Sequence, residues 1–212
     1  MSKNKIKIIV FDMDGVLVDI ESSWQYVHKA FNVNNQDNLR RYLEGKITYS
    51  EFMKRDIFLW GPIHISKIKQ VLDQVPLMKG AKSTISKLRK LGYTTCIISG
   101  GISILAQRVQ KQLGIDYTFA NRLIIDEKGM LVGEGEEIVN LLNKISVLRK
   151  FASDQGTTPR SCAIVGDSVF DIKLFEEAGL SIAFNASNEK VKEAADVIVD
   201  DKDLTRILPY FV

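Results

Sequence analysis

Two aspartates, Asp12 and Asp14, stand one residue apart directly after the apolar segment 6–11. Residues two positions apart on an extended chain face the same side, so both carboxylates can address one site. Neighbouring carboxylates repel each other, and neither is stable in a dry core without a partner. We therefore expect a compensating group at the end of this segment.

Two other apolar segments also lead into acidic or glycine-containing sequences. Asp167 follows the segment 163–165, and Asp171 comes four residues later. In an open α/β sheet, ligands bind beyond the carboxyl ends of the strands, where these side chains would meet. A single acid at such a place is commonly a solvated loop residue, but a group of them offers the hard oxygen ligands that Mg²⁺ prefers. The spacing therefore predicts a Mg²⁺ site at Asp12, Asp14 and Asp167.

Asp171 also has a structural interpretation. Ser168 and Asp171 have the spacing of a capping box at the start of a helix. A capping role and a role at the metal site are compatible, and both stay open.

The tripeptide Ser99-Gly100-Gly101 follows the apolar segment 94–99 and precedes a helical pattern. Glycines let the backbone approach a ligand closely, and a helix N-terminus offers free N–H groups and a partial positive charge. With the Ser99 hydroxyl, this arrangement would bind a phosphate group. The tripeptide alone is equally consistent with an ordinary turn between a strand and a helix.

The elements that must position these residues are read from the apolar pattern. Continuous apolar runs are typical of strands buried on both faces of a parallel sheet. They occur at 6–11, 94–99, 163–165, 181–184 and 197–199. Helical patterns lie between them, at 81–91, 102–113 and 169–178. A glycine follows each pattern, and we expect it to cap the helix in the left-handed conformation: Gly92, Gly114 and Gly179. The alternation predicts a doubly wound α/β core.

Two segments depart from this alternation. Residues 19–76 contain four helical patterns (24–31, 36–43, 49–59 and 66–75) and no convincing strand, with Thr48 and Glu51 spaced as a capping box. We expect a small helical cap domain at 19–76, inserted after the first strand of a core made of 1–18 and 77–212. Within the cap, Trp24, His28 and Trp60 are expected to pack or to be partly exposed. Residues 118–135 have the pattern of a hairpin.

The composition excludes several classes of protein. The chain has 212 residues, 45% hydrophobic and 26% charged, with a net charge of +3 and scattered Lys and Arg, which gives no sign of nucleic-acid binding. No signal peptide or apolar run of about 20 residues is present, so neither secretion nor a membrane span is expected. The two cysteines, Cys96 and Cys162, lie in apolar runs, which favours buried thiols and a cytoplasmic location.

These motifs together resemble the haloacid dehalogenase (HAD) superfamily of phosphatases. The residues that carry the resemblance are Asp12-Met-Asp14-Gly-Val, Ser99, Lys144 and Gly166-Asp167-Ser-Val-Phe-Asp171, in the superfamily's order. The stretches 99–101, 113–124 and 175–187 are similar to those of the members that hydrolyse O-phosphoserine. The resemblance implies a HAD-like, Rossmann-like core with a cap, and a monomer or homodimer that acts on a small phosphorylated metabolite.

The resemblance also implies roles for individual residues. Asp12 would attack phosphorus and form an aspartyl-phosphate, and Asp14 would act as acid and base. Asp12, the Asp14 carbonyl and Asp167 would bind Mg²⁺, with Asp171 nearby. Ser99, the Gly100 N–H group and Lys144 would hold the phosphate. Glu21 falls where these enzymes bind the substrate's amine, and Arg55 falls near their carboxylate-binding arginine.

Two differences from the members that hydrolyse O-phosphoserine leave the identity of the substrate's leaving group undetermined. Gly15-Val16 stands where the phosphoserine-hydrolysing members have Ser or Thr, and Phe170 stands where they have Asn. Phosphoglycolate and sugar phosphates are therefore alternative substrates to O-phosphoserine. A phosphotransferase also fits the sequence. An aspartate-phosphorylated switch fits less well because Asp14 and a cap would serve no purpose there, and the complete set of acids argues against an inactive homologue.

Overall fold

The computed structural model of the protein describes residues 6–211. Its centre is a seven-stranded sheet in the order β4-β3-β2-β1-β5-β6-β7. The strands are β1 (Ile8–Phe11), β2 (Thr94–Ile102), β3 (Tyr117–Ile125), β4 (Leu131–Glu136), β5 (Cys162–Gly166), β6 (Leu180–Phe184) and β7 (Val197–Val199). All neighbours pair in parallel except β3 and β4, which are antiparallel. The predicted α/β fold class and the predicted hairpin are both confirmed.

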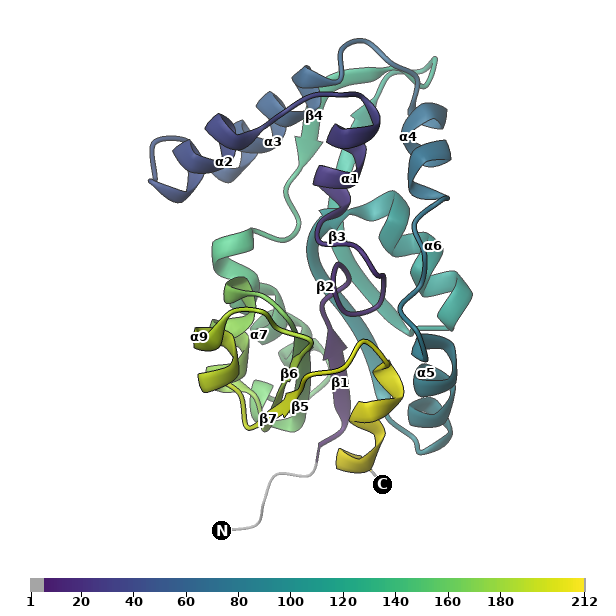
Figure 1. The fold of residues 1–212 in the computed structure, drawn as a ribbon, viewed down its shortest axis with the longest axis vertical. Helices are drawn as coiled ribbons and strands as arrows, with labels where there is room; N and C mark the ends of the chain where they lie inside the picture. Colours follow the sequence, from purple (N-terminus) through teal and green to yellow (C-terminus); the bar gives the residue numbers. More distant parts are fainter. Residues whose placement is uncertain (1–5, 212) are drawn as a thin grey trace.

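Helices cover both faces of this sheet. They are α1 (Ser23–Ala30), α2 (Gln36–Leu43), α3 (Tyr49–Leu59), α4 (Ile65–Leu72), α5 (Ala81–Lys90), α6 (Ser103–Leu113), α7 (Lys144–Asp154), α8 (Ile172–Glu177) and α9 (Glu189–Glu193). Short 3₁₀ helices occupy η1 (Leu141–Asn143), η2 (Pro159–Ser161), η3 (Val169–Asp171) and η4 (Leu204–Tyr210). Helices α5 and α6 lie on one side of the sheet, and α7 and α9 lie on the other (Figure 1).

The apolar core is divided by the sheet because successive side chains of a strand point to opposite faces. Ile9 and Phe11 of β1 pack in the cluster that includes the α5 and α6 side chains. Ile8 and Val10 pack in the cluster that includes the side chains of α7 and α8. The continuous apolar run at the start of the chain therefore follows from burial of β1 on both faces.

The segment 19–76 contains only helices, α1 to α4, and these lie beyond the carboxyl end of β1 (Figure 1). The hairpin joins them, since α3 packs against β4 and His64 pairs with Met130. Thr48 caps α3 by accepting a hydrogen bond from the Glu51 N–H group, as predicted, but the Glu51 carboxylate bonds Arg55 instead of completing a capping box. Among residues 6–211, no helix has both the length and the apolar composition that are needed to cross a membrane.

Three local predictions are corrected by the structure. Strand β2 does not end at Ser99 but continues to Ile102, with a shift in its register against β3 between Ile98 and Ile102. The helical pattern at 169–178 is divided into η3 and α8. Gly179 is not left-handed, unlike Gly92 and Gly114. It is needed because a Cβ atom there would lie 2.1 Å from the Arg160 carbonyl oxygen.

Candidate active site

The strand β1 delivers Asp12 and Asp14 to a loop at its carboxyl end. The Asp12 N–H group continues the sheet pattern by donating to the Val165 carbonyl oxygen at 2.9 Å. Asp12 is almost fully buried, and its Oδ1 accepts a hydrogen bond from the Met13 N–H group at 2.7 Å. The Asp14 Oδ2 accepts hydrogen bonds from the N–H and hydroxyl groups of Ser23, both at 2.8 Å. The first residues of α1 therefore hold the second aspartate.

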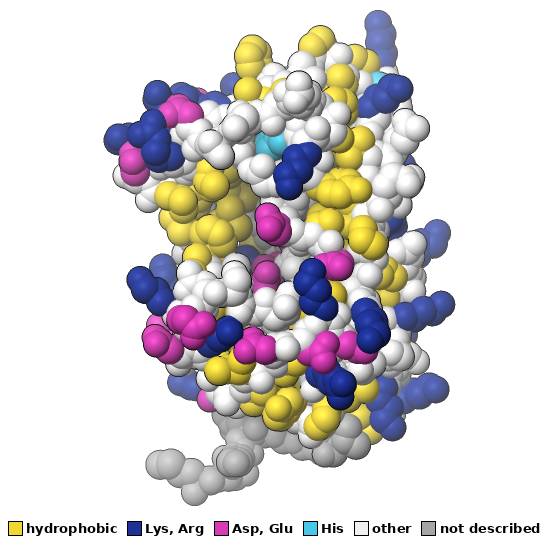
Figure 2. Space-filling model, in the orientation of Figure 1, with side chains coloured by type: hydrophobic (Ala, Val, Ile, Leu, Met, Phe, Trp, Pro, Cys, Tyr) yellow, Lys and Arg dark blue, Asp and Glu magenta, His cyan; other side chains and the backbone are white. Residues whose placement is uncertain are grey.

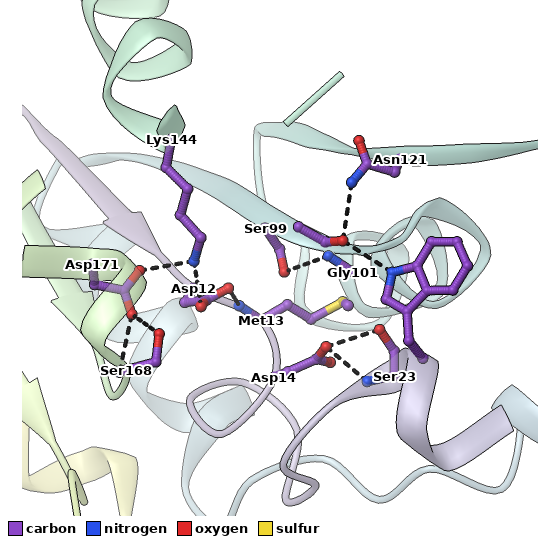
Figure 3. Close-up of polar contacts among 12 residues, drawn as sticks. Asp12, Met13, Asp14, Ser23, Ser99, Gly101, Asn121, Lys144, Ser168 and Asp171 are labelled. Carbon is purple, nitrogen blue, oxygen red and sulfur yellow. Dashed lines mark hydrogen bonds and ion pairs between the residues drawn. The ribbon is translucent and has the colours of Figure 1, made fainter. Parts of the chain in front are cut away.

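Three carboxylates from separate elements meet beyond the carboxyl end of β1, and Figure 3 shows two of them, Asp12 and Asp171, bonded to Lys144. Oxygens of Asp12, Asp167 and Asp171 all lie within 4.8 Å of one another. Asp167 follows β5, and Asp171 ends η3, where its Oδ2 completes a capping box with Ser168. Both roles that the sequence left open for Asp171 are thus compatible with its position. The Asp14 carboxylate is not part of this cluster.

Lys144 provides the positive charge in this cluster. It begins α7, is only 2% exposed, and its Nζ donates to Asp12 Oδ2 at 2.6 Å and to Asp171 Oδ1 at 2.8 Å. Burial opposes its charged form, but the two carboxylates outweigh burial and raise the Lys144 pKa. From the residue pattern alone Lys144 was an ordinary exposed helix residue, so only the family resemblance could identify it.

Burial dominates the protonation of the acids. It raises the pKa of Asp12, although Lys144 opposes this effect, and it raises the pKa of Asp14 to about 7 against the two Ser23 hydrogen bonds. Burial, followed by the charges of Asp12 and Asp171, raises the pKa of Asp167 to about 8. Clustered buried acids resist ionisation unless a positive charge is added.

These residues fit a divalent cation. Hard carboxylate oxygens from three elements converge, and Lys144 balances only part of their charge. Asp14 Oδ1 is buried and has no hydrogen-bond partner among residues 6–211, which leaves a polar atom beside the cluster unsatisfied. A carboxylate set of this kind suits Mg²⁺ and offers no nitrogen or sulfur ligand of the kind softer metals prefer. Asp12, Asp167 and Asp171 are the residues that could hold the ion.

The Ser-Gly-Gly tripeptide lies inside β2, at the register shift, and not in a turn before a helix. Ser99 is buried, and its Oγ accepts a hydrogen bond from the Gly101 N–H group at 3.2 Å. A Cβ atom on Gly100 would lie 2.6 Å from Leu141, and one on Gly101 would lie 2.6 Å from Met13 and Ser23. Close packing therefore requires both glycines, and the phosphate-binding groups expected here belong to a strand, since α6 begins only at Ser103.

The Gly100 carbonyl oxygen accepts hydrogen bonds from three different elements. It accepts hydrogen bonds from Trp24 Nε1 of α1 at 3.0 Å, Tyr49 Oη of α3 at 3.1 Å and Asn121 Nδ2 of β3 at 3.0 Å. Asn121 is fully buried and also binds the backbone of Val139. Tyr49, Asn121 and Ser23 could not be identified from the sequence, since single polar residues in helical and hairpin patterns carry no spacing signal.

One cavity of about 200 Å³ opens onto the carboxylates. Its lining comprises Asp12, Asp14, Glu21, Ser22, Trp24, Gln25, Asn35, Leu39, Phe52, Ser99, Gly100, Gly101, Leu141, Lys144, Asp167, Ser168 and Phe170. In Figure 2 the surface is hollowed between the helical end and the core, with hydrophobic side chains gathered beside the recess. Trp24, which was expected to pack or to be partly exposed, also lines the cavity.

The two residues proposed for substrate recognition are placed differently. Glu21 lies on the cavity wall together with the carboxylates, Ser99 and Lys144. Arg55 is not brought to this cavity: it is half-exposed, bonds Glu51 Oε1 at 2.8 Å, and lies in a separate surface depression with Phe58 and Glu134. The structure therefore brings together every predicted site residue except Arg55.

Comparison with known proteins agrees with this geometry. Residues 6–179 match the family model described as haloacid dehalogenase-like hydrolase. A phosphoserine phosphatase from Methanocaldococcus jannaschii is 34% identical over 212 residues, covering 99% of each chain. One from Archaeoglobus fulgidus is 32% identical and is covered over 58% of its length. A solved substrate-bound phosphoserine phosphatase complex has a TM-score of 0.82 and 32% identity, covering 97% of this chain and 98% of its own.

The chain belongs to the haloacid dehalogenase-like hydrolases. Its relatives place it within the branch of that family whose members are named phosphoserine phosphatase, and it is a hydrolase of the class that acts on phosphoric monoesters.

Proposed function

We propose that the protein is a Mg²⁺-dependent phosphatase that hydrolyses a small phosphorylated metabolite through an aspartyl-phosphate on Asp12. The observation that supports this most is the cluster in which Asp12, Asp167 and Asp171 meet around Lys144 at the base of a cavity. A phosphate monoester is a dianion, so a carboxylate can attack it only where positive charge is arranged in advance.

Asp12 is the nucleophile in this proposal. Its carboxylate is oriented by the Met13 N–H group and by Lys144. An Asp12 oxygen forms a bond to phosphorus while the bond from phosphorus to the leaving oxygen breaks. Water then attacks the phosphorus, the bond to Asp12 breaks, and inorganic phosphate is released.

Asp14 moves the protons. Its raised pKa of about 7 lets it carry a proton near neutral pH, and this proton goes to the leaving oxygen in the first step. The Asp14 carboxylate then takes a proton from the attacking water. Burial is the main cause of this pKa, and the Asp12 charge contributes less.

The phosphoryl oxygens would be bound by Lys144, Ser99 and the Gly100 N–H group, which all line the cavity. Mg²⁺, held by Asp12, Asp167 and the Asp14 carbonyl with Asp171 beside them, would neutralise charge on the phosphoryl group. We further propose that 19–76 acts as the cap domain over the core of 1–18 and 77–212, and that it excludes water from the cavity.

O-phosphoserine is the first candidate substrate because the relatives carry that name and Glu21 could hold its ammonium group. Arg55 would have to leave Glu51 and reach the cavity to bind its carboxylate. A second candidate is another small phosphomonoester. It is favoured by the cavity lining, in which Lys144 is the only Lys or Arg among the described residues.

The test is phosphate release from a panel of phosphorylated metabolites, with Mg²⁺ and with EDTA, without any acceptor other than water. We expect Mg²⁺-dependent release that Asp12→Asn abolishes. Asp19→Asn is the matched control, because Asp19 is an exposed acid that pairs with Lys202 at 2.8 Å, and it should leave release unchanged. Release that persists in EDTA or in Asp12→Asn would contradict the proposal. Transfer of the phosphoryl group to an added acceptor, without phosphate release in water alone, would indicate a phosphotransferase.

A further inference from the structure

A buried polar network runs from the core of the helical segment to the cavity wall. Its first member is Trp60, whose Nε1 donates to His28 Nδ1 at 2.8 Å. An indole N–H group can only donate, so His28 Nδ1 is the acceptor and the proton of the neutral ring lies on Nε2. His28 Nε2 then donates to Asp56 Oδ2 at 3.1 Å. His28 and Asp56 are fully buried.

Asp56 fixes the orientation of two amides in turn. An ionised carboxylate only accepts hydrogen bonds, so Asn35 must direct its Nδ2 at Asp56 Oδ2, at 2.6 Å. Asn38 Nδ2 donates to the other oxygen at 3.0 Å. The Asn35 Oδ1 atom is thereby turned toward Gln25, whose Nε2 donates to it at 2.5 Å. The orientation of the Gln25 amide follows from a chain of donors that begins at Trp60.

The orientation of the Gln25 amide determines which hydrogen-bonding group it presents to a ligand in the cavity. Gln25 and Asn35 both line the cavity, and the Gln25 Oε1 atom accepts no hydrogen bond from the residues that the structure describes. Glu21, on the same wall, adds a carboxylate. The side chains of Gln25 and Glu21 therefore present a hydrogen-bond acceptor and a negative charge on this wall, which also carries the Ser22 hydroxyl group.

The positive charge that Lys144 brings to the cavity is already paired with carboxylates. Lys144 is held by Asp12 and Asp171 at the phosphoryl end, so no Lys or Arg among the described lining residues remains for a second anionic group. A carboxylate on the leaving group would face Glu21 and the Gln25 oxygen without a cationic partner, and like charges placed together cost affinity.

We propose that Gln25, oriented through Asn35, Asp56 and His28, selects a leaving group that carries ammonium or hydroxyl donors and no carboxylate. The substrate class is the phosphate monoester of an amino alcohol or a polyol. This inference rests on the proposed function, because it assumes that the cavity receives the leaving group, and it selects the second candidate substrate named there over O-phosphoserine. Gln25 is a specificity residue, and Asn35, Asp56 and His28 are positioning residues.

The test compares two ligands that differ only by a carboxylate, O-phosphoethanolamine and O-phosphoserine. Their binding to Asp12→Asn with Mg²⁺ is measured by calorimetry, so that the result does not depend on turnover. We expect O-phosphoethanolamine to bind about tenfold or more tightly. Glycerol 3-phosphate, which has hydroxyl donors instead of an ammonium group, separates the two kinds of donor. Equal or tighter binding of O-phosphoserine would overturn the inference.

Variants at Gln25 sharpen the test. Gln25→Lys places a cation on the wall and should lower the preference against O-phosphoserine by about tenfold. Gln25→Met, which is similar in length and uncharged, should weaken donor-bearing ligands without favouring O-phosphoserine. An unchanged ligand ratio in Gln25→Lys would contradict the assignment. The wild-type ratio remains readable if either variant fails to fold.

The positioning residues need a kinetic readout. Asp56→Asn can donate as well as accept, so it no longer fixes the direction of the amides. The KM for O-phosphoethanolamine should rise several-fold while kcat changes less. An equal fall of kcat for all substrates would indicate a structural role only. Absence of Mg²⁺-dependent phosphate release by the wild type would refute the proposed function, whereas the binding ratio tests the selectivity of the wall by itself.

Discussion

At the scale of single residues, the main feature of the site is that several negative charges are buried close together. Three carboxylates share the end of the sheet, and Lys144 neutralises part of their charge through two short ion pairs. Removing one partner of a buried ion pair is costly because the remaining charges are left in a poorly solvated place. We therefore expect Lys144 to contribute to the stability of the fold, in addition to its proposed role in phosphate binding.

Lys144→Met tests this contribution. We expect the free energy of unfolding in EDTA to fall by about 3–5 kcal/mol, because Asp12 and Asp171 lose their shared partner. Urea unfolding followed by circular dichroism measures the change, and Mg²⁺ should reduce the loss. Lys150→Met on the same helix is the control, since that exposed lysine pairs with Asp154 at 3.0 Å and should cost about 0–1 kcal/mol. Equal effects of the two substitutions would contradict a structural role for Lys144.

Some residues of the site could be predicted from the sequence, and others could not, for a physical reason. Asp12, Asp14 and Asp167 follow apolar strands, and Ser99 lies in the last part of another. Because the carboxyl ends of parallel strands meet, their convergence could be predicted. Gln25 could not be found in this way, because its orientation depends on contacts between α1, α3 and the segment between them. Such contacts leave no periodic signal in the chain.

At the scale of elements, strand β2 is where expectation and structure differ most. Two adjacent glycines after an apolar run indicated a turn, yet β2 continues through them and bends at a register shift. The glycines are required by what lies against the strand: Leu141 beside Gly100, and Met13 and Ser23 beside Gly101. The continuous apolar runs, in contrast, predicted β1, β2, β5, β6 and β7, because an apolar run is read from each strand's own sequence. The parallel pairing of β3 with β2 was not predicted, since β3 was expected only as part of a hairpin.

Gly101→Ala tests whether this close packing positions the catalytic acid. The new Cβ atom would lie 2.6 Å from Ser23 Oγ and 3.0 Å from Asp14 Oδ2, so it would displace the acid and its partner. We expect kcat to fall about 100-fold with the fold retained, as steady-state kinetics and circular dichroism would show.

The control for this prediction is Gly92→Ala, at a left-handed position with open space around it. It should cost about 1–2 kcal/mol of stability through backbone strain and leave kcat unchanged. A Gly101→Ala enzyme with full kcat would show that the Ser23–Asp14 contact does not need this packing.

At the scale of the whole molecule, the parallel sheet gathers the acids at one edge, and the helices α1 to α4 lie beyond that edge (Figure 1). The hairpin β3–β4 lies with these helices because α3 packs against β4. The order of strands in the sheet was not predicted, since continuous apolar runs identify strands without saying which of them pair. In the proposed function the core supplies the chemistry and the helical end supplies the wall that faces the leaving group, so these two roles can be tested separately.

The most direct test of the central claim is mass spectrometry of the protein quenched in acid during turnover with Mg²⁺. The account predicts one phosphoryl group on the peptide that contains Asp12 in the wild-type protein. Asp12→Asn should carry none. Rapid turnover without any phosphoryl group on Asp12, or a phosphoryl group on a different residue, would contradict the account.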